Sequence, residues 1–189
     1  MFRAALFATL FLCTTTTVSL ADEYTVDPTH AYVVFSVQHK GLAPNWGRFN
    51  RVSGTINVNE DVSKNSLNVE IEAASVDTGH AKRDAHLRNA DFFDAGQFPK
   101  ITFKSSAWKA IDATTYEVTG AITFHGITQP LTLTLKKTGE GVDRKGRHRL
   151  GYTTEFQIDR FAHGVRYAAK GIGQMVRVIV SAETTKKSP

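Results

Sequence analysis

The sequence predicts an all-β fold, an antiparallel barrel or sandwich of about eight strands with one short helical insertion. Apolar and polar residues alternate over most of the chain, and a period of two is the pattern of strands with one buried face. Turn-forming residues separate these short segments at regular intervals, as in all-β barrels and sandwiches. Residues 79–94 do not alternate throughout, which places the insertion there.

Each expected strand has an apolar face and a polar face. In residues 65–77, Leu67 and Val69 point one way while Asn68 and Glu70 point the other. The same alternation predicts strands, in chain order, at residues 31–39, 52–58, 65–77, 100–105, 116–124, 131–135, 148–158 and 175–183.

Turns and one bend divide these strands. Turn-forming residues stand between consecutive segments, as in Asp143-Arg144-Lys145-Gly146. The spacing from Phe49 to Val52 breaks the alternation, and Gly54 follows. We therefore expect a β-bulge or a tight barrel bend at this place.

The helical insertion lies between the third and fourth expected strands. Asp77 or Thr78 can cap a helix, because a short polar side chain accepts a hydrogen bond from a free backbone N–H. We expect a short helix or helical loop at residues 79–89, followed by a turn at residues 91–94.

The N-terminus has the three parts of a secretory signal peptide. Arg3 supplies a positive charge, residues 4–12 are small or apolar, and Ser19 and Ala21 are the small residues before a cleavage site. The apolar run is too short to span a bilayer, which takes about 20 residues. We expect residues 1–21 to be removed after Ala21 on export.

Removing 21 residues from 189 leaves 168, which is enough for one domain with its own core. We expect this domain at residues 22–183 and a disordered tail at residues 184–189. The single cysteine, Cys13, leaves with the signal, so the core must hold the fold without a disulfide. The remaining net charge of +4 is scattered, which does not indicate nucleic-acid binding.

The sequence contains no motif that specifies catalysis or metal binding. His80 and Asp84 share a helical face, but a zinc site takes three or four ligands. A nucleophile elbow is missing, whereas a Ser-His-Asp arrangement stays open because its members need to meet only in space. We expect no catalytic residue, no metal and no cofactor.

Ordered fragments along the whole chain after the signal point to a known family. They include Asp27-Pro28-Thr29-His30, Arg83-Asp84-Ala85-His86-Leu87, Asp91-Phe92-Phe93-Asp94, Phe98-Pro99-Lys100-Ile101-Thr102-Phe103-Lys104-Ser105 and Gly126-Ile127-Thr128. With these fragments, the chain resembles the YceI-like family of polyisoprenoid-binding proteins. The resemblance implies a lipocalin-like antiparallel barrel whose elongated apolar channel holds a long isoprenoid or similar lipid, in proteins exported to the bacterial periplasm. The chain departs from the family pattern at residues 159–164 and at Gln174.

A periplasmic carrier that sequesters an isoprenoid or another long-chain lipid is the function that this resemblance implies. Apolar strand residues would contact the lipid, although the same residues in a packed core would look identical in sequence. The expected ligand contacts are Phe35, Val37, His39, Phe49, Ile71, Phe103, Phe124, Leu133 and Phe156.

The inserted segment is expected to close one end of the barrel. Arg83, Asp84 and His86 would form a hydrogen-bonded and ionic latch, with Phe92 and Phe93 filling apolar space beneath it. A direct role of these polar groups in holding a lipid head group is the alternative, because polar groups at a pocket mouth orient ligands.

Two other classes of protein stay open at this point. A lipid-modifying enzyme would use His39, Asp84 or His86 as acid or base. An outer-membrane barrel also alternates, but such barrels commonly end in an aromatic residue, whereas this chain ends in residues 184–189, TTKKSP. We expect a mature chain without an integral membrane segment, and the sequence does not separate a monomer from a homodimer.

Overall fold

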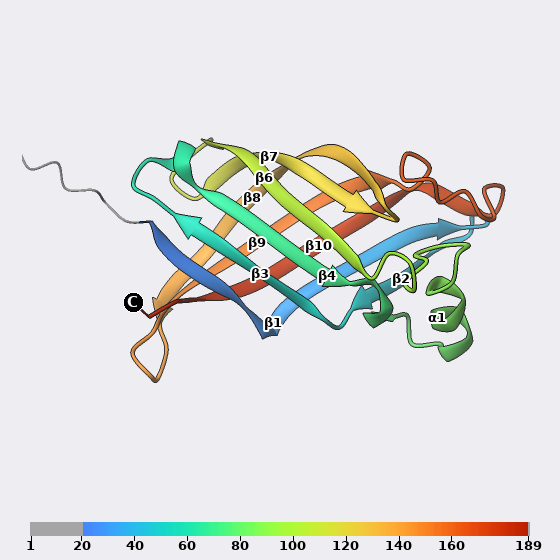
Figure 1. Cartoon of the computed structure of the whole chain (residues 1–189), viewed down its shortest axis with the longest axis horizontal. Coiled ribbons are helices and arrows are strands. Elements are labelled where there is room, and N and C mark those ends of the chain that lie inside the picture. The colour runs from blue at the N-terminus through green and yellow to red at the C-terminus, as the bar shows by residue number, and fades with distance from the viewer. Residues whose placement is uncertain (1–20, 189) are drawn as a thin grey trace, which may run out of the picture.

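The computed structural model describes residues 21–188, which form a closed antiparallel β-barrel with one short helix at its end (Figure 1). The expected signal peptide, apart from Ala21, lies outside these residues. The barrel consists of β1 (Asp22–His39), β3 (Val52–Val58), β4 (Ser66–Glu72), β6 (Lys100–Ala110), β7 (Thr115–Phe124), β8 (Ile127–Val142), β9 (His148–Asp159) and β10 (Ile172–Lys186). Outside the barrel are β2 (Ala43–Phe49), β5 (Val76–Asp77), α1 (Ala81–Leu87) and the 3-10 turns Val62–Lys64 and Ala73–Ser75.

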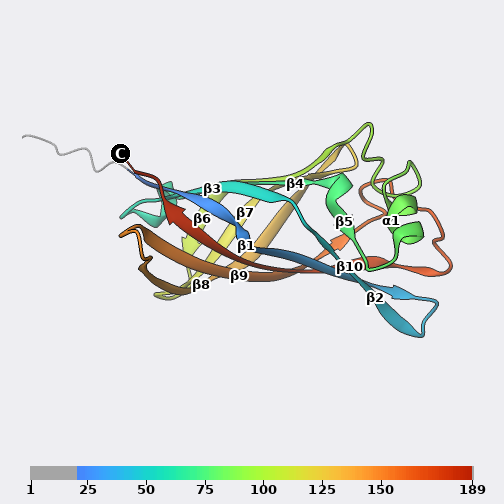
Figure 2. The same cartoon turned by 90° about the horizontal axis from the view of Figure 1, so that it is seen from below.

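Each barrel strand pairs with its neighbours in the order β1, β3, β4, β6, β7, β8, β9, β10, and β10 closes the circle on β1. β1 is long, and two strands pair with it along one edge. Its first residues pair with β3 at residues 55–58, and residues 33–39 pair with β2. The helix α1 and the loop between β9 and β10 lie at one end of the barrel, and the C-terminus lies at the other (Figures 1 and 2). We call these the helix end and the terminal end.

The expected all-β fold is confirmed, and the expected apolar faces point inward. In β7, for example, Val118, Ile122 and Phe124 are buried, while Glu117 is exposed. Within residues 21–188, no helix is long and apolar enough to cross a membrane.

Two expectations for the chain segments next to the strands are wrong. β10 continues to Lys186, so residues 184–186 are not a disordered tail. Thr184 is buried there and donates a hydrogen bond to the backbone carbonyl of Leu150, 3.1 Å away. The N-cap of α1 is His80, whose Nδ1 accepts from the backbone N–H of Arg83, rather than Asp77 or Thr78.

The expected bend after Phe49 is where the chain leaves β2 and enters β3, and Gly54 follows two residues into that strand. A Cβ atom at Gly54 would lie 2.4 Å from the backbone oxygen of Asn68 on β4. The two strands approach this closely only because glycine has no side chain.

We predict that Gly54→Ala lowers the free energy of unfolding by about 2 kcal/mol, because the backbone of β4 must move away from the new methyl group. Urea denaturation of both proteins measures this difference. Gly139→Ala is a matched control, since a Cβ there meets no atom within 4 Å. An equal effect of both substitutions would contradict the account.

Candidate ligand cavity

An elongated cavity of about 380 Å³ lies inside the barrel. Its lining is almost entirely apolar and comes from every barrel strand, from Val26 and Thr184 near the terminal end to Arg160 and Tyr167 at the helix end. Ligand sites in proteins commonly have volumes of about 300–1,000 Å³ with a few placed polar groups. The cavity has the size and the chemistry of such a site.

All nine residues that the sequence suggested as ligand contacts line this cavity. The alternative that their side chains fill the barrel interior completely is therefore wrong. Alternation brings them to the inner face of six barrel strands and of β2, which lies beside β1. They are Phe35, Val37, His39, Phe49, Ile71, Phe103, Phe124, Leu133 and Phe156.

An apolar cavity of this volume lowers the stability of a folded protein. With a penalty of about 24 cal/mol per Å³, a void of about 380 Å³ costs on the order of 9 kcal/mol relative to a packed interior. The whole stability of a typical domain is about 5–15 kcal/mol. Filling a cavity of this volume would therefore contribute an amount comparable to the stability of a whole domain.

Phe93 narrows the cavity at the helix end. Its ring centroid lies 5.3 Å from that of Phe49, 5.5 Å from that of Phe124 and 6.5 Å from that of Phe35. Phe92 belongs to a second group of rings. Three rings, those of Phe92, His86 and Tyr167, meet edge to face with centroids 5.0–5.2 Å apart.

Polar contacts hold α1 over this end, and Thr78 is their centre. Asp84 is buried, and its Oδ1 accepts hydrogen bonds from the Thr78 hydroxyl at 2.5 Å and from the Thr78 backbone N–H at 2.9 Å. Arg83 donates from Nε to the Thr78 hydroxyl at 2.7 Å and from Nη2 to its backbone oxygen at 2.9 Å. His86 instead pairs with Asp91, 2.8 Å away. Arg83 and His86 line the cavity, as do Phe92 and Phe93, whereas Asp84 does not.

Arg160 is a cavity residue that the sequence did not single out. It follows the last residue of β9 and is 3% exposed. Its guanidinium donates four hydrogen bonds of 2.8–3.0 Å to backbone oxygens of the loop between β9 and β10 and of the start of β10. Burial lowers the pKa of Arg160, with Asp159 opposing the shift, but an arginine stays charged at neutral pH. The acceptors are the carbonyls of Val165, Tyr167, Ile172 and Gly173.

Other cavity residues were also missed. Trp46 lies on β2, and Tyr152 and Thr154 lie on β9, all of them lining the cavity. Tyr152 and Thr154 lie on the same inward face of β9 as Phe156, so alternation alone could have found them. His163, in the segment that departs from the family pattern, is 2% exposed and donates from Nδ1 to the Ile127 carbonyl, 3.0 Å away.

The barrel wall is incomplete near the helix end. Pairing of β8 with β9 ends at Leu135 and Thr154, so residues 127–134 of β8 pair with β7 alone. The loop between β9 and β10 makes hydrogen bonds across this gap, such as the one from Gln129 Nε2 to the backbone oxygen of Ala162 at 3.1 Å. This part of the wall opens more readily than a continuous ladder, because fewer backbone bonds must break.

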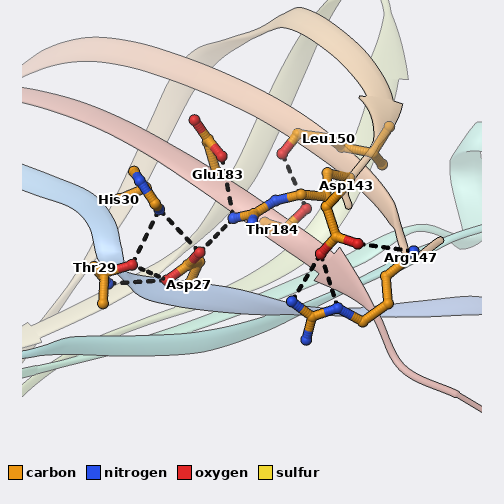
Figure 3. Close-up of polar contacts among 9 residues, drawn as sticks. Asp27, Thr29, His30, Asp143, Arg147, Leu150, Glu183 and Thr184 are labelled. Carbon is orange, nitrogen blue, oxygen red and sulfur yellow. Dashed lines mark hydrogen bonds and ion pairs between the residues drawn. The ribbon is translucent and has the colours of Figure 1, made fainter. Parts of the chain in front are cut away.

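The terminal end is held by an ionic cluster around Asp27 (Figure 3). Pairing of β1 with β10 is irregular between Val26 and Ala31, and Asp27 lies in this irregular stretch. Its carboxylate accepts from Thr29 at 2.7 Å and contacts His30 at 3.0 Å. Arg149 on β9 bridges Asp27 to Glu183 on β10. The cluster therefore joins three strands where the ladder is interrupted.

We predict that this cluster makes stability depend on pH. Hydrogen bonds from Thr29, then from His30 and Arg149, hold the pKa of Asp27 far below its usual range. A lowered carboxylate pKa stabilises the folded state above the unfolded pKa of about 4, and this contribution is lost as the pH falls below it. Asp27→Asn should lower the free energy of unfolding by about 2 kcal/mol at pH 7 and by less at pH 3.

Urea denaturation at both pH values checks this prediction. Glu60→Gln, which changes an exposed carboxylate in a turn, is the control. A stability difference between wild type and Asp27→Asn that is the same at both pH values would show that the charge of Asp27 does not act as described.

The acid and base candidates for an enzyme do not form one group. Among residues 21–188, no hydrogen bond joins any two of His39, Asp84 and His86. Residues 21–188 also contain no cluster of three or more His, Cys, Asp or Glu side chains that could hold a metal ion.

A closed antiparallel barrel around one apolar cavity defines a lipocalin-like class of protein. The family model described as "YceI-like domain" matches residues 24–184, and the chain belongs to this family. The proteins named Protein YceI in Salmonella arizonae and Salmonella enteritidis PT4 are each 37% identical to it over 172 residues, which cover 89% of this chain and 90% of the relative.

Solved structures share the same fold. BcnA of Burkholderia cenocepacia superposes with a TM-score of 0.76 at 22% identity, covering 84% of this chain and 98% of that one. A polyisoprenoid binding domain from Saccharophagus degradans, implicated in plant cell wall breakdown, has a TM-score of 0.67 at 16% identity and covers 89% and 100%. At these identities, the two structures support the barrel fold alone.

Proposed function

We propose that this protein binds an isoprenoid or another long-chain lipid in the barrel cavity and carries or sequesters it in the periplasm without changing it chemically. The apolar cavity of about 380 Å³ is the observation that carries the proposal. A protein of the same fold also supports it, because the structural relative from Saccharophagus degradans is a polyisoprenoid binding domain.

Burial of hydrocarbon is enough to account for such binding. Each buried CH₂ group contributes about 0.8 kcal/mol, so ten carbons supply on the order of 8 kcal/mol before the chain is ordered. Micromolar affinity corresponds to about 8.2 kcal/mol. A longer isoprenoid therefore offsets the entropy that it loses in the cavity.

The helix end is where we place the lipid's access and its polar head. Arg83, His86 and Arg160 line the cavity there, and the section of β8 that pairs with β7 alone lies at the same end. Arg160 uses four of its five N–H donors on carbonyls, whereas Arg83 uses two, so Arg83 has more donors left for a head group.

Chain length gives a direct test of the proposal. We expect the affinity of lipid-free protein for prenyl alcohols of 10, 15 and 20 carbons to rise by about tenfold or more for each added isoprene unit. Quenching of Trp46 fluorescence reports the binding, because this side chain lines the cavity. Affinity that does not rise with length would contradict burial of the chain, and a product chemically different from the added alcohol would contradict carriage.

The location has its own test. The intact mass of protein released by osmotic shock should correspond to residues 22–189, as cleavage after Ala21 requires. Protein that stays in the cytoplasmic fraction with its N-terminal segment attached would contradict the periplasmic part of the proposal.

A further inference from the structure

Two buried residues of the cavity carry hydroxyl groups that have no hydrogen-bond partner in the part of the chain that the structure describes. Tyr152 and Thr154 lie two residues apart on the inward face of β9, and each is 8% exposed. The Thr154 Oγ1 atom is buried without a partner. The Tyr152 hydroxyl likewise makes no hydrogen bond with residues 21–188, although tyrosine hydroxyls usually find a partner when buried.

Other hydroxyl groups in the same region do form hydrogen bonds within the protein. Thr184 Oγ1 donates to the Leu150 carbonyl at 3.1 Å, and Tyr24 shares a hydrogen bond of 3.0 Å with His148 Nδ1. A buried hydroxyl without such a partner destabilises the folded protein, because it gives up water and gains nothing. Tyr152 and Thr154 are therefore unusual for this barrel.

The two hydroxyl groups lie far from the charged residues of the cavity. Arg160 at the helix end is eight residues further along the chain than Tyr152, about 26 Å along an extended strand. The other charged or titratable residues of the lining, His39, Arg83 and His86, also belong to the helix end. Burial, with smaller effects from Tyr116, Tyr24 and Glu140, raises the pKa of Tyr152, so its hydroxyl is neutral and can donate.

We propose that Tyr152 and Thr154 form a hydrogen-bonding subsite, deep in the cavity toward the terminal end, for an uncharged oxygen of the bound lipid. A hydroxyl or a carbonyl oxygen fits, because the Tyr152 hydroxyl can donate to either. A phosphate or carboxylate does not fit, because no cation lines this part of the described cavity and a buried, unpaired charge is very costly. Lys137, which lies opposite Tyr152 on β8, is outside the lining and is already paired with Glu140 at 2.9 Å. The inference rests on the proposed lipid binding and adds a second polar contact. Besides the head group at the helix end, the bound lipid has an uncharged oxygen at its inner end that Tyr152 and Thr154 hold.

The test compares four probes with 20-carbon prenyl chains: the alcohol, the aldehyde, the diphosphate and the hydrocarbon that lacks oxygen. Wild type, Tyr152→Phe and Thr154→Val are measured as full mature chains after lipid removal. We expect wild type to bind the alcohol or the aldehyde about fivefold more tightly than the hydrocarbon. Tyr152→Phe should abolish this preference and Thr154→Val should reduce it, while hydrocarbon affinity stays unchanged. Which oxygen is preferred identifies the lipid's inner group.

Thermal stability without ligand separates this role from a structural one. Removing an unsatisfied hydroxyl should raise the Tm of Thr154→Val by about 3 °C, whereas Thr184→Val should lower the Tm because it breaks a formed hydrogen bond. Thr134→Val, on the exposed face of β8, controls for the substitution itself.

The possible failures are distinguishable. If wild type binds all probes but the preference survives in Tyr152→Phe and Thr154→Val, the subsite is wrong and lipid binding stands. A preference for the diphosphate that depends on Tyr152 would also overturn the subsite. If wild type binds no probe, the proposed function fails and the subsite fails with it.

Discussion

Val178→Trp should reduce the affinity for a 20-carbon prenyl alcohol by about a hundredfold while the barrel stays folded. Val178 is buried, lines the cavity and pairs with Phe35 on β1 and Phe156 on β9. An indole there occupies space that the lipid would fill, and displacing about four CH₂ groups removes about 3 kcal/mol of burial. Fluorescence or calorimetric titration of lipid-free protein measures the loss.

Stability must be measured on the same samples, because the new side chain enters a void rather than packed atoms. We expect the Tm of ligand-free Val178→Trp to equal or exceed that of wild type. Met175→Trp is the matched control, since Met175 lies on the same strand, is 47% exposed and does not line the cavity. Unchanged lipid affinity in a folded Val178→Trp protein would show that lipid does not occupy the middle of the barrel.

The largest loss of stability is expected for Arg160→Met, by about 3 kcal/mol in the free energy of unfolding. The substitution leaves four carbonyls of the loop between β9 and β10 and of the start of β10 without their donor. Arg160→Lys should recover less than half of the loss, because an ammonium group does not reproduce the planar array of guanidinium donors. Urea denaturation gives the magnitude, and hydrogen exchange shows whether residues 160–171 open first.

Arg166→Met is the control for Arg160→Met. Arg166 lies in the same loop but is exposed, and it contacts the Phe161 ring at 5.3 Å. Equal stability of Arg160→Met and wild type would mean that water replaces the guanidinium without penalty, and the role assigned to Arg160 would then be wrong.

The barrel strands were predictable because each buries one face against the cavity or the core, which imposes a period of two. β2 was not, since Pro44 and Gly47 make Ala43–Phe49 a poor strand by composition. Its pairing with β1 overrides this composition, and Gly47 is needed there because a Cβ would lie 2.4 Å from the Phe35 ring. Local propensity does not contain such a tertiary contact.

The candidate site, like the fold, could be predicted from the sequence only in part. Alternation identified which phenylalanines point inward, but whether they meet or leave a cavity depends on the distances between strands. Arg160 and His80 were missed because backbone groups of the folded loops fix their roles. The latch was found in part: Arg83 and Asp84 do meet, but through Thr78, and His86 pairs separately with Asp91.

Native mass spectrometry of protein purified without detergent from the cells that make it tests the central claim most directly. The account predicts a complex whose excess mass, released on activation, belongs to one long-chain, mostly hydrocarbon molecule. The corresponding sample of Val178→Trp should lack this mass. Wild-type protein that carries no lipid and takes up none of the added prenyl compounds would contradict the claim that the cavity holds a hydrocarbon chain.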